Sequence, residues 1–79
     1  MTLFETAWKS YEQSCMRPST SVAQRIEMRR AFYAGAATTL NAVLETGEDH
    51  ISEDAGVETL ESMKADIAIF TEKVKNGQA

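Results

Sequence analysis

Mostly apolar residues recur at alternating steps of four and three along two stretches of this chain, and this spacing constrains its fold more than any other feature. The first stretch runs through Val22, Ile26, Arg29, Tyr33, Ala36, Leu40 and Val43. The second stretch runs through Gly56, Leu60, Met63, Ile67, Phe70 and Val74. On an α-helix these steps place the side chains along one face, as in a heptad repeat. Two long helices, over residues 21–46 and 53–75, are therefore predicted, with an arginine at one core-type position of the first.

Capping residues predict the ends of these two helices. Ser21 and Gln24 form a capping box, in which each side chain bonds to the backbone N–H of the other residue. Gly47 should end the first long helix, because glycine readily adopts the left-handed conformation of a helix end. Ser52 should cap the second. Two helices of similar length joined by a loop of about five residues predict an antiparallel hairpin.

A shorter helix is predicted over residues 3–15. It begins at a capping box of Thr2 and Glu5, and Pro18 ends it by disfavouring helical geometry in the residue before. Its apolar face is formed by Phe4, Trp8, Tyr11 and Cys15. Residues 1–79 are thus predicted as a single all-α domain of three helices, with the short N-terminal helix packed on the long antiparallel hairpin.

The length and the net charge of this chain bear on its oligomeric state and on the ligands it binds. A domain of 79 residues gains only about 3–5 kcal/mol from one core unless it is stapled or oligomeric, so a homo-oligomer is expected. The net charge of −4 argues against general binding to nucleic acid, because such domains usually carry a basic face. In the predicted hairpin, however, basic residues gather at one end and acidic residues at the other. A local site for an anion is compatible with that polarity.

Cysteine usage and hydropathy indicate a cytosolic protein. The single cysteine, Cys15, excludes an internal disulfide, and its place on the apolar face of the first helix predicts a buried thiol. No apolar run approaches the roughly 18 residues that a membrane span requires. No charged segment followed by an apolar one, the pattern of a secretion signal, is found. We therefore expect no membrane partner.

The candidate site is the arginine run at the start of the second helix. It comprises Arg25, Arg29 and Arg30, with Arg17 just upstream. Arg25 and Arg29 share a helix face, where like charges oppose helix formation by roughly 0.2–0.5 kcal/mol. A helix start also favours anions over cations. A sequence that accepts both penalties predicts negative charge close by.

Two sources of that negative charge are open. The first is internal: Arg25 and Arg29 would pair with Glu72 across the hairpin or with Glu12 on the first helix. The second is a ligand: the guanidinium groups, with Tyr33 one turn further on, would grip a phosphate or a partner's carboxylate and stack on a base.

No catalytic or metal-binding constellation is predicted. His50, the only histidine, lies in the loop among carboxylates, and a transition-metal site normally needs more imidazole or thiolate ligands. One histidine and one cysteine far apart do not supply a base, a nucleophile and an orienting group. We therefore expect no enzyme activity, no metal and no cofactor.

Several segments resemble small accessory proteins of tailed bacteriophages and prophages. They are Gln24-Arg25, Met28-Arg29-Arg30-Ala31-Phe32-Tyr33-Ala34-Gly35-Ala36, the preceding Trp8, Tyr11 and Glu12, and the later Ser52-Glu53-Asp54-Ala55-Gly56-Val57. The resemblance implies expression in the cytoplasm of an infected bacterium, and it assigns no catalytic residue. Proteins of this class often act stoichiometrically on a host factor or a defence signal. The leading hypothesis is a counter-defence factor that sequesters an anionic nucleotide signal through the arginine-rich helix start.

Other functions stay open. The acidic residues from Glu45 to Glu58 would let the protein inhibit a host defence complex directly, by imitating nucleic acid toward a basic partner. A DNA-binding regulator is disfavoured, because the second helix is long, apolar on two sides and followed by an acidic helix. A structural role in the virion or its assembly is the last alternative.

Overall fold

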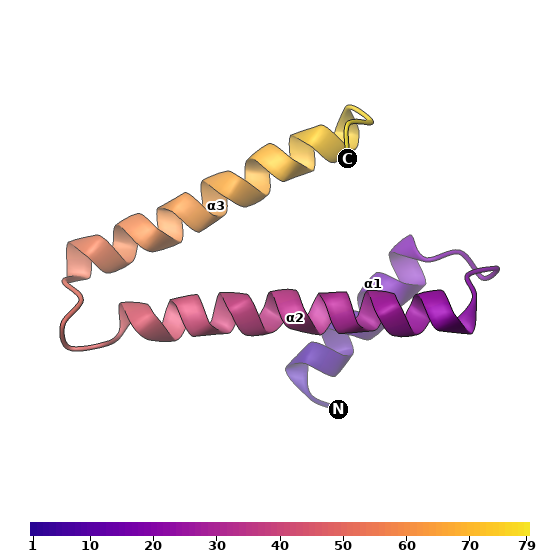
Figure 1. The fold of residues 1–79 in the computed structure, drawn as a ribbon, viewed down its shortest axis with the longest axis horizontal. Helices are drawn as coiled ribbons and strands as arrows, with labels where there is room; N and C mark the ends of the chain where they lie inside the picture. The colour runs from indigo at the N-terminus through magenta and orange to yellow at the C-terminus, as the bar shows by residue number, and fades with distance from the viewer. The chain divides into compact units, whose positions relative to one another are not determined.

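The computed structural model describes residues 1–79 and contains three α-helices and no strand (Figure 1). They are α1 (Leu3–Cys15), α2 (Val22–Thr46) and α3 (Glu53–Lys75). The all-α class and the three predicted helices are confirmed, and only the start of α2 differs, by one residue. The chain divides within α2 into two compact units, Met1–Leu40 and Asn41–Ala79. The prediction of one domain over 1–79 stays a prediction, and each unit is described by itself.

The first unit is held together by an aromatic cluster between α1 and the first half of α2, which α1 crosses (Figure 1). Trp8 is 3% exposed and is the one buried large side chain of the protein. Its ring centroid lies 5.8 Å from that of Tyr11 and 5.6 Å from that of Phe32. Phe4 meets Tyr33 edge-on at 6.4 Å. Such aromatic pairs contribute about 0.5–1.5 kcal/mol each beyond the area they bury, so the predicted packing of the short helix is confirmed in this unit.

The predicted residues cap all three helix starts, but the box of Thr2 and Glu5 forms only in part, because the Glu5 carboxylate accepts from Thr2 Oγ1 at 2.9 Å and not from the Thr2 N–H. The backbone N–H of Glu5 donates to Thr2 Oγ1 at 3.2 Å, and that of Ala55 donates to Ser52 Oγ at 3.1 Å. At the start of α2 the N–H of Gln24 donates to Ser21 Oγ at 3.1 Å, and the N–H of Ser21 donates to Gln24 Oε1 at 3.4 Å. This reciprocal pair is the predicted capping box, and it leaves Ser21 just outside the helix.

The second unit contains the turn between α2 and α3. α2 ends at Thr46 as predicted, but Gly47 does not adopt the left-handed conformation, which in this chain only Gly77 has, with φ of 72°. The turn is instead held by backbone hydrogen bonds between residues three positions apart, such as the one from Gly47 N–H to Leu44 O at 3.1 Å. Beyond it the start of α3 approaches the end of α2 closely, because a Cβ built on Gly56 would lie 3.3 Å from Thr46 Cβ. The hairpin is supported at this turn, and its pairing further along the helices stays a prediction.

Within the second unit, the apolar face of α3 is largely uncovered. Ile67 is 66% exposed, Phe70 59% and Val74 52%. The only buried residue of α3 is Gly56. Cys15, at the end of α1, is also exposed, so the predicted burial of its thiol is wrong. The apolar face of α1 therefore ends with Tyr11, since the cluster around Trp8 does not extend a further turn.

Candidate anion-binding site

Arg25 belongs to the internal structure of the first unit. Its Nη1 donates to Glu12 Oε2 at 3.2 Å, its Nη2 donates to the carbonyl oxygen of Arg17 at 3.0 Å, and its Nε donates to that of Thr20 at 3.4 Å. The side chain is 30% exposed and that of Glu12 is 24% exposed. One guanidinium thus joins α1, the connecting loop and α2. Of the two carboxylates predicted as internal partners, Glu12 is the one that Arg25 contacts.

Glu72, the other predicted partner, pairs within its own helix. Its Oε1 lies 3.5 Å from Lys75 Nζ, with both side chains about two thirds exposed. This pair spans one turn at the end of α3. Its contribution to stability is small, because exposed ion pairs are solvated and screened.

Four residues one turn apart on α2 line an open hollow of about 430 Å³. They are Ile26, Arg29, Arg30 and Tyr33. Their spacing of three, four and seven places all four on one helix face. The guanidinium carbon of Arg29 lies 5.7 Å from the centroid of the Tyr33 ring, within the range of a cation–π contact. The hollow therefore combines two cations with an apolar and aromatic surface.

The guanidinium groups of Arg29 and Arg30 are less well paired with carboxylates than that of Arg25. Arg29 is exposed and takes part in none of the ion pairs of the chain. Arg30 Nη1 lies 3.2 Å from Glu27 Oε1, but both side chains are more than 70% exposed. A pair that exposed contributes roughly 0–1 kcal/mol, so an incoming anion displaces Glu27 at little cost.

Tyr33 is anchored at the inner edge of the hollow. Its half-buried ring packs edge-on against Phe4 at 6.4 Å and against Phe32 at 5.9 Å. Packing on two sides restricts the rotamers of the tyrosine, which lowers the entropy lost when a ligand ring binds against it. The hollow thus has a packed aromatic wall beside exposed cationic side chains.

The structure brings together three of the five predicted site residues, namely Arg29, Arg30 and Tyr33. Arg25 and Arg17 do not line the hollow. Arg29 is exposed within the first unit, and the burial expected at its core-type position against α3 stays a prediction. Sequence reasoning did not assign Ile26 to the site, although its place one turn before Arg29 and Arg30 would have shown that it shares their face.

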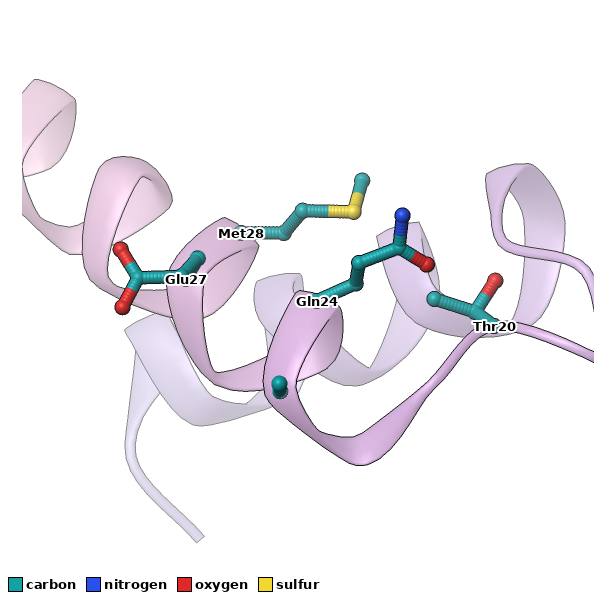
Figure 2. A pocket seen from close by; sticks show the side chains of 5 residues that line it. Thr20, Gln24, Glu27 and Met28 are labelled. Carbon is teal, nitrogen blue, oxygen red and sulfur yellow. The ribbon is translucent and has the colours of Figure 1, made fainter.

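A neighbouring hollow of about 470 Å³ lies on another side of the start of α2. Its lining includes Thr20, Gln24, Glu27 and Met28, and Figure 2 shows Glu27 at the end away from Thr20. Its only charged group is a carboxylate, which repels anions. The Arg29–Arg30 hollow is therefore the better place for an anionic ligand.

The fold and the hollow define a small helical protein with an exposed cationic and aromatic surface on α2. No family model, curated protein or solved structure matches the chain. No helix has the length and apolar character needed to cross a membrane. No group of three or more His, Cys, Asp or Glu side chains is arranged to hold a metal ion.

Proposed function

We propose that this chain is a non-enzymatic, phage-type binding protein that sequesters an anionic nucleotide in the hollow of Ile26, Arg29, Arg30 and Tyr33. The observation that carries the proposal is the position of two weakly satisfied guanidinium groups beside an anchored tyrosine. A nucleotide presents a phosphate and a flat base. The hollow offers a complementary group for each of them.

Each group in the hollow has a distinct part in binding. Arg29 and Arg30 donate paired N–H groups to phosphate oxygens, a geometry that guanidinium groups match better than a lysine does. The base lies against Tyr33 and Ile26, where stacking on an aromatic ring contributes about 1–3 kcal/mol per base. Arginine stays protonated at all physiological pH values. The site thus holds its ligand by charge and stacking, as stoichiometric sequestration requires.

Binding of this kind would give the protein its proposed counter-defence role by removing a signalling nucleotide from solution. A small protein made in excess inside an infected bacterium lowers the free concentration of a signalling nucleotide without destroying it. The host receptor for that signal then stays empty. The ligand class is defined by its chemistry: at least one phosphate and at least one base.

Isothermal titration calorimetry with a panel of linear and cyclic nucleotides tests the proposal. At least one nucleotide should bind, and Arg29→Ala should weaken it by about tenfold or more, since hydrogen bonds to charged groups contribute about 1.5–3 kcal/mol. Arg17→Ala is the matched control, because it removes the same charge from outside the hollow and should leave the affinity nearly unchanged. Circular dichroism verifies that both variants remain helical.

Three results would count against the proposal. Absence of binding across the whole panel would remove it. Equal losses in Arg17→Ala and Arg29→Ala would show that only net charge matters. Inorganic phosphate binding as tightly as the best nucleotide would exclude the contact with the base.

A further inference from the structure

We propose that two copies of this chain associate through the apolar face of α3, which pairs antiparallel with α3 of the partner subunit. The α3 face, as we name it, carries the four-three spacing of a coiled-coil seam along almost the whole helix. It consists of Leu60, Met63, Ile67, Phe70 and Val74. Four of its large side chains are between 42% and 66% exposed. A seam of this length left in water lacks the burial that gives such a helix its stability.

The unit that contains α3 does not cover this face. In Asn41–Ala79 the buried residue is a glycine, Gly56. Segments below about 40 residues usually need a disulfide, a metal or another chain to hold a stable fold. A second helix packed on the α3 face would supply the missing burial.

The charges along α3 select an antiparallel copy of α3 as that second helix. The helix begins with Glu53 and Asp54 and ends with Lys73 and Lys75. Antiparallel pairing places the acidic start of each α3 beside the basic end of the other, and it also opposes the two helix dipoles. A parallel pair would instead gather four carboxylates at one end and four ammonium groups at the other.

The antiparallel register also pairs the four central side chains of the face. Leu60 lies opposite Phe70 of the partner subunit, and Met63 lies opposite Ile67 of the partner subunit. Val74 lies outside these pairs, because Gly56, its counterpart in this register, is already covered by Thr46 of its own chain. Asp66 then lies near its own copy beside the symmetry axis, but this like-charge pair is exposed and weak.

The charges of α2 make it a poorer partner for the α3 face than a second copy of α3. A hairpin closed along its full length would bring the basic start of α2, with Arg25 and Arg30, beside Lys73 and Lys75. The carboxylates of Glu12, Glu27 and Glu72 balance this positive charge only in part. The same hairpin would also bring Glu45 at the end of α2 beside Glu53 and Asp54. Like charges would then meet at both ends, which the α3 pair avoids.

Sedimentation equilibrium over a wide range of protein concentrations measures the association. The protein should fit a monomer–dimer equilibrium. Phe70→Glu, which puts a carboxylate into the face of each copy, should weaken the dimer by at least about tenfold. Ala65→Glu is the control, because residue 65 lies on the opposite side of α3 and is exposed. It should change the dissociation constant by less than about threefold.

Spin labels determine the direction of the pairing. Gln78→Cys, made with Cys15→Ser and labelled, should give a distance between labels of about 35 Å or more, since the two ends of α3 lie that far apart. A parallel pair would bring the labels within about 20 Å, because packed helix axes lie about 8–10 Å apart.

A wild-type protein that stays monomeric at every concentration would overturn the proposal, and so would a dimer that Phe70→Glu leaves intact. Equal weakening by Ala65→Glu would assign the association to another surface. A short distance between labels would reject the antiparallel pair. The experiment uses no nucleotide, so its outcome is independent of the proposed ligand.

Discussion

At the scale of single residues, four arginines in one short stretch occupy three different environments. Arg25 is held by Glu12 and two carbonyl oxygens. Arg29 and Arg30 face the hollow, where their charge is at most weakly paired. Arg17 contributes its carbonyl oxygen to Arg25 and lies outside that hollow. The same side chain is thus structural at one position and available for a ligand at another.

Arg25→Met should lower the free energy of unfolding by about 1–3 kcal/mol, because it removes hydrogen bonds from a charged donor and leaves the half-buried Glu12 carboxylate with only the exposed Lys9, at 3.9 Å. Arg30→Met is the matched control. It breaks only an exposed pair and should cost less than about 0.5 kcal/mol. Urea unfolding followed by circular dichroism measures both changes. Equal losses would mean that the contacts of Arg25 do not stabilise the fold.

At the scale of helices, the two glycines within α2 and α3 sit in opposite surroundings. A Cβ built on Gly35 meets no atom within 4 Å, so nothing in the single chain uses the absence of its side chain. A Cβ on Gly56 would lie 3.3 Å from Thr46 Cβ and 3.4 Å from its carbonyl oxygen. Glycine thus permits a close approach of the two helices where α3 leaves the turn, whereas in α2 it only adds conformational freedom to the unfolded chain.

Gly35→Ala should raise the free energy of unfolding by about 0.5–1 kcal/mol, because alanine loses less backbone entropy than glycine in a helix. Gly56→Ala should give no such increase in the free energy of unfolding, because its added methyl group would press on Thr46. Thermal unfolding of the two variants side by side measures the difference. A destabilised Gly35→Ala protein would reveal a close contact at Gly35 with a second subunit.

At the scale of the whole molecule, the division within α2 separates two units of different charge and packing. Residues 1–40 carry five basic and three acidic side chains, and residues 41–79 carry three and nine. The first unit has an aromatic cluster around Trp8, whereas the second leaves most of its apolar side chains exposed. The first unit should therefore be the more stable one.

Dilute protein should unfold in two steps that different probes separate. Trp8, the only tryptophan, reports the first unit by its fluorescence, and far-ultraviolet circular dichroism reports all three helices. We expect the helix signal to begin falling at a lower urea concentration than the Trp8 signal changes. Coincident transitions would instead favour the single cooperative domain that the sequence predicts.

The sequence by itself determined the helices and their starts. Each cap joins residues three positions apart, as in Thr2 with Glu5 and Ser21 with Gln24. Such interactions depend only on neighbours along the chain, and the spacing of apolar residues likewise depends on one helix at a time. The arginine run and Tyr33 were identified in the same way, because residues one turn apart share a face.

Only the tertiary structure decided which arginines are free. The choice of Glu12 over Glu72 joins residues 13 positions apart through the packing of α1 on α2. The exposure of Arg29 and of Cys15 also depends on how far the cluster around Trp8 extends. Burial is set by which faces meet in space, and a periodic pattern marks a face as apolar without naming what covers it.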